Sequence, residues 1–190
     1  MSSTIIDDRL ISLAKKFCCD KYFSHSYIDF YSYLLSKLKI KRLLEIGIGY
    51  EDLMKPFVPK YIHGASLLMW REYLPEAQIM ACDIREDTLI QDKRITSVQC
   101  DQSSVLSLLD MIGRLGGEFD IVIDDGSHIQ QHQILAAKTL LPYLSRDGVY
   151  VIEDVFDHEI EDTARRLNGV PVRFNMRSDD NLVVIRKDKT

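Results

Sequence analysis

The sequence predicts an α/β protein with a doubly wound, mostly parallel sheet of seven strands and a helical segment at its N-terminus. Short apolar runs of strand length alternate with longer segments in which apolar residues recur at helical spacing. Two of the runs, at residues 119–123 and 149–152, lead directly into acidic side chains. With 190 residues, 46% of them hydrophobic, the chain is long enough for one domain with a sizeable core.

The N-terminal residues are predicted to form helices that cap the sheet. Within residues 4–18, Leu10, Leu13 and Phe17 recur near helical spacing, and residues 27–38 repeat this pattern. We therefore expect a single domain over residues 1–190, made of a helical cap (residues 1–40) and an α/β core (residues 41–190).

Strands and helices alternate through the core. The predicted strands cover residues 41–47, 78–84, 95–100, 119–123, 149–152, 172–176 and 182–186. The predicted helices cover residues 64–73, 105–115, 130–144 and 158–167. Pro75 and Gly116 follow the first two of these helices, and a turn over residues 145–148 follows the third. A polar loop over residues 50–63, containing two prolines, separates the first strand from the first core helix.

Composition and charge exclude several classes of protein. The net charge of -5, with no basic stripe, argues against nucleic-acid binding. No apolar run approaches the ~20 residues needed to span a bilayer, and the N-terminus has no signal pattern. The four cysteines form no CxxC pair, which favours reduced, structural thiols. We expect a cytoplasmic protein that binds neither nucleic acid nor membrane; a homo-oligomer is compatible with this pattern.

Acidic side chains follow two strands that we expect to be neighbours in the sheet. One strand leads into Asp124-Asp125-Gly126-Ser127-His128, and the other into Glu153-Asp154. Ligands of parallel α/β sheets bind beyond the carboxyl ends of the strands, and adjacent strands lie only ~4.8 Å apart. Carboxylates this close are unfavourable unless a cation or a proton relieves them. The pattern predicts a metal-assisted proton-transfer site.

The first half of the core predicts a nucleoside site. Gly47 and Gly49 form a turn after the first strand, where the backbone can approach a ligand, and Glu45 just before them could hold an ammonium group. The third glycine of the dinucleotide fingerprint is missing. Asp83 could accept the ribose hydroxyls, and Asp101-Gln102 could contact an adenine edge. Equally, Asp83 could start a surface turn, and Asp101 could cap the helix before Val105. Taken together, these strand ends suggest S-adenosylmethionine.

Seven segments of the chain carry a resemblance to a known family. They are Asp20-Lys-Tyr22 with His25-Ser-Tyr27, Leu43-Leu-Glu-Ile-Gly-Ile-Gly49, Gly64-Ala-Ser-Leu-Leu-Met-Trp-Arg71, Cys82-Asp-Ile84, Cys100-Asp-Gln-Ser103, Ile123-Asp-Asp-Gly-Ser-His128 and Ile152-Glu-Asp154. With these motifs the chain resembles the class I S-adenosylmethionine-dependent methyltransferases, and more narrowly the metal-dependent O-methyltransferases of macrolide-antibiotic sugars. The antibiotic enzymes carry a large additional N-terminal region that the sequence here does not include.

The resemblance implies a Rossmann-like methyltransferase fold, a Mg²⁺ ion and a role for each matching residue. It implies Asp125, Glu153 and Asp154 as metal ligands, with Asp125 also part of the catalytic centre and His128 as the general base. It implies a cofactor pocket lined by Glu45, Gly47, Gly49, Asp83, Asp101, Gln102 and Asp124, with Ser66 and Tyr22 as additions. The implied reaction is methylation of a sugar hydroxyl in a glycan or natural product.

Other interpretations of the same residues stay open. His128 could satisfy local backbone at a helix start, and Glu153-Asp154 could be a surface turn. His128 and His132 have the spacing of a zinc pair, but neither a thiol nor a third histidine joins them. Trp70 and the tyrosines of residues 27–33 suit helix packing better than a ligand wall.

Three alternative functions also fit parts of the pattern. A catechol-like vicinal diol could be methylated with the same metal. A non-enzymatic nucleoside-binding module would need Glu45 and Asp83 but not the acidic cluster. A nicotinamide dehydrogenase is disfavoured by the missing glycine. Near the carboxylates, the pKa of His128 should rise, while a bound cation would oppose that rise.

Overall fold

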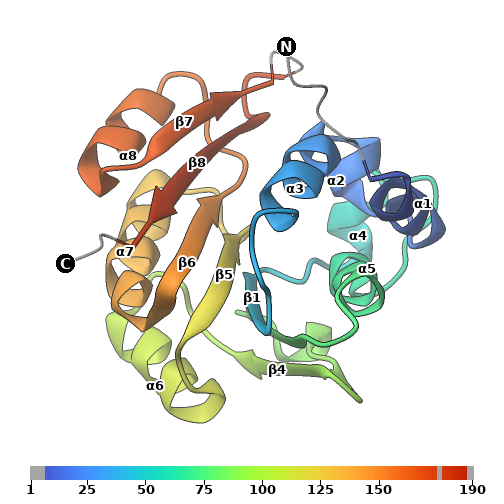
Figure 1. The fold of residues 1–190 in the computed structure, drawn as a ribbon, viewed down its shortest axis with the longest axis horizontal. Coiled ribbons are helices and arrows are strands. Elements are labelled where there is room, and N and C mark those ends of the chain that lie inside the picture. Colours follow the sequence, from blue (N-terminus) through green and yellow to red (C-terminus); the bar gives the residue numbers. More distant parts are fainter. Residues whose placement is uncertain (1–6, 175–176, 188–190) are drawn as a thin grey trace.

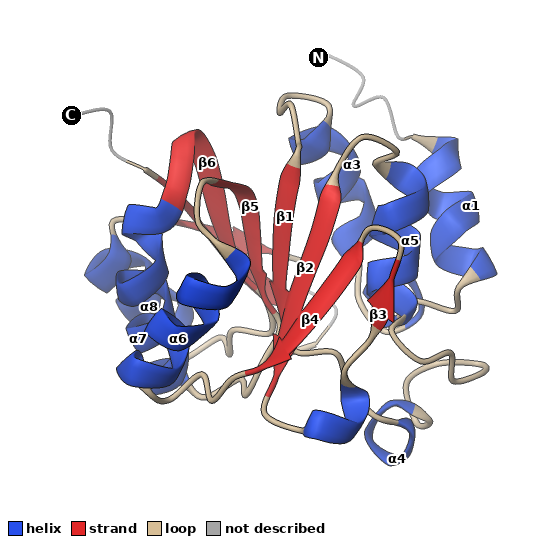
Figure 2. Ribbon diagram, turned by 90° about the horizontal axis from the view of Figure 1, so that it is seen from below, coloured by secondary structure: helices blue, strands red, loops and turns tan. Residues whose placement is uncertain are grey.

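The computed structural model describes residues 7–174 and 177–187, which form a sheet of eight strands between two layers of helices (Figures 1 and 2). The strand order is β3-β4-β2-β1-β5-β6-β8-β7. The strands are β1 (Arg42–Ile46), β2 (Gln78–Asp83), β3 (Gln91–Asp92), β4 (Ile95–Gln99), β5 (Phe119–Asp124), β6 (Leu144–Ile152), β7 (Val170–Arg173) and β8 (Asn181–Arg186). The five central strands β4, β2, β1, β5 and β6 are parallel, whereas β8 runs antiparallel to both of its neighbours. The predicted doubly wound, mostly parallel sheet is therefore confirmed.

The helices are divided between the two faces of the sheet. One layer contains α1 (Asp8–Lys16), α2 (Asp20–Phe23), α3 (Tyr27–Leu35) and α5 (Ala65–Tyr73), and the other α6 (Val105–Leu115), α7 (Gln130–Leu140) and α8 (Ile160–Leu167) (Figure 1). The short helix α4 (Glu51–Met54) lies in the loop after β1, and two 3-10 turns cover Glu86–Thr88 and Leu141–Tyr143.

Side-chain alternation along the strands produces two hydrophobic cores. Successive residues of a strand point to opposite faces, so Leu43 packs in one core with Trp70 and Leu44 in the other with Leu108. Residues 43–46 of β1 are buried throughout, as expected for a central parallel strand covered on both faces. The resulting rigid sheet fixes where the strand ends lie.

The structure differs from the sequence prediction at several boundaries. Helix α7 ends at Leu140, a 3-10 turn containing Pro142 follows, and β6 begins at Leu144. Residues 145–148, expected as a turn, belong to β6, which pairs with β5 through a shift in register. The eighth strand, β3, has only two residues and no periodicity to reveal it. The predicted helix over residues 4–18 and strand over residues 172–176 fall partly outside the described residues.

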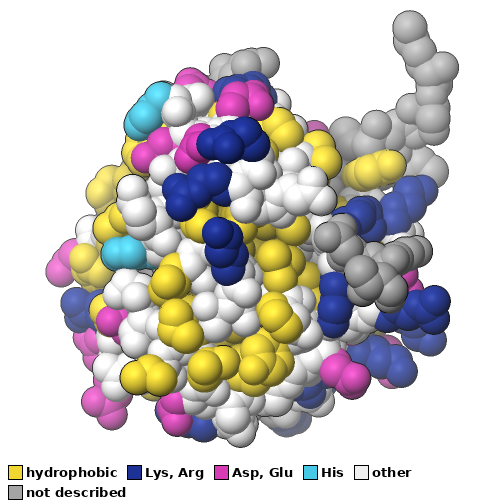
Figure 3. Space-filling view, turned by 90° about the vertical axis from the view of Figure 1, so that its left-hand side faces the viewer, with side chains coloured by type: hydrophobic (Ala, Val, Ile, Leu, Met, Phe, Trp, Pro, Cys, Tyr) yellow, Lys and Arg dark blue, Asp and Glu magenta, His cyan; other side chains and the backbone are white. Residues whose placement is uncertain are grey.

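The outer surface carries exposed apolar groups on one side. Hydrophobic side chains gather over part of the face that α6, α7 and α8 present (Figure 3), and the exposed ones on α6 are Val105, Leu106 and Leu109. Within residues 7–174 and 177–187, no helix combines the length and hydropathy needed to cross a membrane.

Candidate active site

The acidic ends of β5 and β6 converge, as their positions in the sheet require. Ile46 pairs with Asp124 and Asp124 with Ile152, so the segments after these strands start side by side. Gly47 makes the close approach possible: it has φ +95°, and a Cβ there would lie 2.0 Å from the carbonyl oxygen of Asp125.

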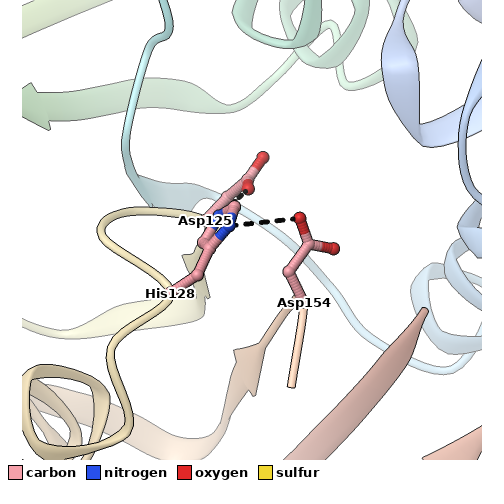
Figure 4. Close-up of side chains that lie close together, drawn as sticks. All are labelled: Asp125, His128 and Asp154. Atoms are coloured by element: carbon pink, nitrogen blue, oxygen red, sulfur yellow. Dashed lines mark hydrogen bonds and ion pairs between the residues drawn. The ribbon is translucent and has the colours of Figure 1, made fainter. Parts of the chain in front are cut away.

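Asp125, His128 and Asp154 form a compact group at this edge (Figure 4). His128 Nε2 lies 3.1 Å from Asp125 Oδ1, and His128 Nδ1 lies 3.5 Å from Asp154 Oδ2. Ligand atoms of all three residues lie within 4.8 Å of one another. His128 and Asp154 both have a positive φ, near +55° and +53°, which is uncommon for residues other than glycine and marks two tight turns at the ends of β5 and β6.

The donor set of this group suits a hard divalent cation. Mg²⁺ prefers oxygen ligands and usually keeps several waters, so two carboxylates that approach from adjacent strands are a suitable anchor. The third expected ligand, Glu153, is directed elsewhere in this structure. Its carboxylate binds Lys21 and Tyr31, and its side chain is only 1% exposed.

Lys21 is the principal site residue that sequence reasoning missed. Its ammonium, with no solvent exposure, donates to Asp125 Oδ2 at 2.7 Å and to Glu153 Oε2 at 2.5 Å, and lies 3.3 Å from Glu45 Oε1. Burial alone would lower the pKa of Lys21, but the three carboxylates together raise it well above its usual value. The only sequence signal was its place in the Asp20-Lys21-Tyr22 motif.

Two tyrosines of α3 donate hydrogen bonds to the acidic residues that follow β6. Tyr27 donates its hydroxyl to Asp154 Oδ1 at 2.7 Å, and Tyr31 donates to Glu153 Oε1. Both rings are fully buried, so the expected packing role is correct and each hydroxyl adds a polar contact to the site.

Burial and neighbouring charges shift the protonation of the site. Burial opposes a charged imidazole, yet Asp125 and Asp154 raise the pKa of His128 to about 9, in the direction expected from the sequence. Burial would raise the pKa of Asp125, but Lys21 and His128 hold it well below its usual range. Burial raises the pKa of Asp154 and, to about 7, that of Asp124.

A cavity of about 500 Å³ opens beside the acidic group. Asp125, His128 and Asp154 line it together with six of the expected cofactor residues, namely Gly47, Gly49, Ser66, Asp83, Asp101 and Gln102. The carboxylate of Asp83 accepts the backbone N–H groups of Ile48 and Arg85, which fixes the glycine turn against β2. Gln102 Oε1 accepts from Ser127 N at 2.9 Å and so connects the end of β4 to the loop that carries His128.

Asp101 lies at the cavity and does not cap the helix α6. It lines the cavity, and its carboxylate accepts the backbone N–H and the hydroxyl of Ser103. The cap of α6 itself is Ser104, whose side chain accepts from Ser107 N.

Three of the expected cofactor residues do not line the cavity. Glu45 is fully buried, where its Oε2 accepts from Trp70 Nε1 at 2.8 Å. Asp124 is fully buried on the other face, where it accepts from Tyr150 and Gln102. Tyr22 packs against the core beneath Lys15. At the end of β5, Asp124 points toward Tyr150 in the packed layer, whereas Asp125 faces the cavity.

The remaining histidines occupy different surroundings. His25 Nδ1 lies 3.1 Å from Asp180 and 3.5 Å from Asp154, within the cavity lining. His132 Nδ1 lies 3.0 Å from the hydroxyl of Ser127 and takes no part in the acidic group. His63 contacts Tyr61, and His158 is exposed.

Comparison with known proteins relates this geometry to a defined class. No family model matches the chain. It is 40% identical over 119 residues to mycinamicin VI 2''-O-methyltransferase of Micromonospora griseorubida, covering 60% of this chain and 27% of that protein. It is 35% identical over 149 residues to 8-demethyl-8-alpha-L-rhamnosyl tetracenomycin-C 2'-O-methyltransferase of Streptomyces olivaceus, covering 77% of this chain and 37% of that protein. The chain thus spans about a third of the length of these curated relatives.

Solved methyltransferase structures share the fold of this chain. The MycE methyltransferase of the mycinamycin pathway, in complex with Mg and SAH, aligns over 95% of this chain and 55% of its own with a TM-score of 0.74 and 26% identity. Its complex that also contains mycinamycin VI aligns over 83% and 39% with a TM-score of 0.68 and 32% identity. The N-methyltransferase NodS from Bradyrhizobium japonicum shares the fold alone, at 15% identity and a TM-score of 0.53.

The fold is therefore that of the class I methyltransferases. Within this class, the chain is a homologue of the O-methyltransferases that act on the sugars of macrolide and tetracenomycin antibiotics, as its motifs predict.

Proposed function

We propose that this chain is an S-adenosylmethionine-dependent, Mg²⁺-assisted O-methyltransferase that acts on a sugar hydroxyl of a glycan or natural product. The observation that carries the proposal is the convergence of Asp125, His128 and Asp154 on one side of a cavity whose other side carries the nucleoside motifs. The names of both curated relatives specify O-methylation, and the name of the Streptomyces olivaceus relative specifies a rhamnosyl substrate; both support this reaction class.

S-adenosylmethionine, as the methyl donor, would be held along the ends of β1, β2 and β4. Gly47 and Gly49 let the backbone approach the ligand, and Asp83 can accept its ribose hydroxyls. Asp101 and Gln102 lie where an adenine would contact them, and Ser66 borders the same cavity. Glu45 and Asp124 support the pocket from behind through Trp70 and Gln102.

Asp125 and Asp154 would anchor the metal, which as a Lewis acid would acidify and orient an acceptor hydroxyl. His128 would accept the proton that the hydroxyl releases. Its imidazole must be neutral to do so, and its pKa of about 9 depends on the uncompensated charges of these two aspartates. Cation binding at Asp125 and Asp154 would thus also prepare His128 to act as a base.

The surroundings of Asp154 favour a sugar over a catechol. Its carboxylate is 3.5 Å from His25 Nδ1, and Arg177 and Asp179 line the same cavity. Charged and hydrogen-bonding groups suit the several hydroxyls of a sugar, whereas a planar catechol would require apolar walls around the metal. The helices of residues 1–40 contribute Lys21, Tyr27 and Tyr31, which supports their proposed role as a cap that completes the site.

Mass spectrometry tests the proposed reaction. The protein is incubated with S-adenosylmethionine, Mg²⁺ and a panel of rhamnosides, other glycosides and catechols, with Asp154→Asn as the matched variant. We expect one added methyl group on a glycoside, abolished by excess chelator and by the variant. Methylation of catechols alone would support the alternative acceptor class. Absence of both methyl transfer and calorimetric binding of S-adenosylmethionine would refute the proposal.

A further inference from the structure

We propose that His25 is an acceptor-binding residue, whose cavity-facing ring nitrogen forms a hydrogen bond with a sugar hydroxyl other than the one that is methylated. This inference rests on the proposed O-methyltransferase function and adds the contact that selects the acceptor. The buried carboxylate of Asp180 is then a positioning residue, because it acts on the sugar only through the His25 ring.

His25 lies on the side of the metal site that faces away from the cofactor motifs. Its Nδ1 is 3.5 Å from Asp154 Oδ1, while Nδ1 of His128 is 3.5 Å from Asp154 Oδ2, so the two imidazoles flank opposite oxygens of one carboxylate. Asp180, the partner of His25, directly precedes β8, which lies on the side of β6 away from β5, β1, β2 and β4 (Figure 1). A sugar bound at the metal on this side would therefore lie beside His25.

Asp180 fixes the orientation of the His25 ring. Nδ1 lies 3.1 Å from Asp180 Oδ1, and the ring stacks on Tyr27 with centroids 4.7 Å apart and planes inclined by 17°. An ionised carboxylate only accepts hydrogen bonds, so we assign the proton of the ring to Nδ1. The Asp180 side chain has no solvent exposure, and among the described residues its Oδ2 has no hydrogen-bond partner. A buried carboxylate satisfied at one oxygen costs folding free energy, and a role in orienting His25 accounts for its position.

The second ring nitrogen of His25, Nε2, is left for a ligand. His25 lines the cavity although its side chain is only 7% exposed. Within residues 7–174 and 177–187, Nε2 has no hydrogen-bond partner, yet it is not one of the side-chain atoms that are both unpartnered and closed to solvent. Nε2 therefore faces the cavity. With the proton on Nδ1, it can accept a hydrogen bond from a hydroxyl of a bound molecule.

This contact would discriminate between acceptors by the pattern of their hydroxyls. His128 would take the proton from the hydroxyl that reacts, and His25, beside the other oxygen of Asp154, would bind a second hydroxyl of the same sugar. An acceptor without the second hydroxyl would leave the Nε2 lone pair unpaired in a site closed by the bound sugar, which is unfavourable. His25 would thus favour glycosides that carry both hydroxyls.

A cycle that combines protein variants with acceptor analogues tests this contact. The probes are methyl α-L-rhamnoside and methyl α-D-glucoside, each with its monodeoxy analogues, and kcat/KM is measured with S-adenosylmethionine and Mg²⁺. The variant His25→Asn keeps an N–H group at the δ position for Asp180 but has no nitrogen at the ε position. For one hydroxyl, we expect kcat/KM of the parent to exceed that of the deoxy analogue by at least ~5-fold in the wild type and by less than ~2-fold in His25→Asn.

Further variants separate a contact with the sugar from a merely structural role. His25→Gln places an amide nitrogen at the ε position and should restore part of the preference for the parent acceptor, although it gives up the contact with Asp180. Asp180→Ala should weaken the preference without changing which hydroxyl it concerns. His158→Asn alters an exposed histidine outside the cavity, and this matched control should keep the wild-type preference. If His25→Asn does not fold, His25→Asn/Asp180→Asn, which also removes the buried charge, takes its place.

The outcomes separate this inference from the proposed function. A ratio of parent to deoxy analogue that is the same in the wild type and in His25→Asn for every hydroxyl would overturn the role given to His25. Mn²⁺ affinity, measured by calorimetry, should be unchanged in His25→Asn; its loss would assign the ring to the metal site and overturn the inference too. If the wild type methylates a glycoside while either result is obtained, only this inference fails. If the wild type methylates none of these probes, the inference fails, and the proposed function fails with it unless the wider acceptor panel yields a methylated glycoside.

Discussion

Replacing His128 with alanine should lower kcat by ~10²–10⁴-fold, the usual contribution of a general base. The structure also predicts how the rate should depend on pH. With a pKa of about 9, only about 1% of the His128 imidazole is neutral at pH 7, two units lower, unless a cation offsets Asp125 and Asp154. Since only neutral imidazole accepts a proton, the wild-type rate should rise with pH and level off above the apparent pKa. This apparent pKa should lie below 9 when Mg²⁺ is saturating.

The assay is a pH profile of kcat at saturating S-adenosylmethionine and Mg²⁺, combined with Mn²⁺ affinity for the same proteins. His128→Ala should lose the rise with pH yet bind the metal with little change. His158→Ala is the matched control, because that histidine is 77% exposed outside the cavity and should give the wild-type profile. Near-wild-type kcat in His128→Ala would refute the assignment as base, and loss of metal would identify His128 as a ligand.

Further predictions concern the cofactor, the metal and the buried acids. Asp83→Ala should weaken S-adenosylhomocysteine binding by ~1–3 kcal/mol in calorimetry, whereas a residue of a surface turn would have no effect. Asp154→Asn should lose Mn²⁺ binding and turnover but keep cofactor binding; retained metal-dependent turnover would contradict its role. Trp70→Phe removes the hydrogen-bond donor to the buried Glu45 carboxylate, so urea denaturation should show an unfolding free energy lower by ~1–3 kcal/mol. An unchanged unfolding free energy would show that this contact is unimportant. Burial raises the pKa of Asp124 to about 7, so between pH ~4 and ~7 this carboxyl ionises in the unfolded state only, and the free energy of unfolding should fall as pH rises. Asp124→Asn should remove roughly 3–4 kcal/mol of that fall. The prediction would be contradicted if the free energy of unfolding of the two proteins varied with pH in parallel.

The sequence predicted the meeting of the acidic strand ends because the sheet geometry is regular. Apolar runs indicated β5 and β6, and in a parallel sheet their carboxyl ends lie at the same edge, which brings Asp125, His128 and Asp154 together. The glycine turn and Asp83 followed from the same rule. These residues depend on local pattern and topology, both of which can be inferred from one sequence.

The alternating direction of side chains along each strand limited the prediction of cofactor-binding residues. Treating every acid at a strand end as a ligand contact included Glu45 and Asp124, which point into the packed layers. Which face a given residue takes depends on where the strand ends, and such boundaries are uncertain by a residue or more.

Lys21 lay beyond local pattern altogether. It is 104 residues from Asp125 and 132 from Glu153 along the chain, and α2 has only four residues and no side-chain cap. A lysine in such a segment is normally expected at the surface. Only the packing of the N-terminal helices against the strand ends reveals that its charge belongs to the site.

A crystal structure of the protein with S-adenosylhomocysteine and Mn²⁺ tests the central claim most directly. The account predicts an anomalous Mn²⁺ peak within bonding distance of Asp125 and Asp154, and an adenosyl group in the cavity with its ribose on Asp83. Absence of Mn²⁺ from these aspartates at saturating concentration, or a cofactor bound outside the cavity, would contradict it.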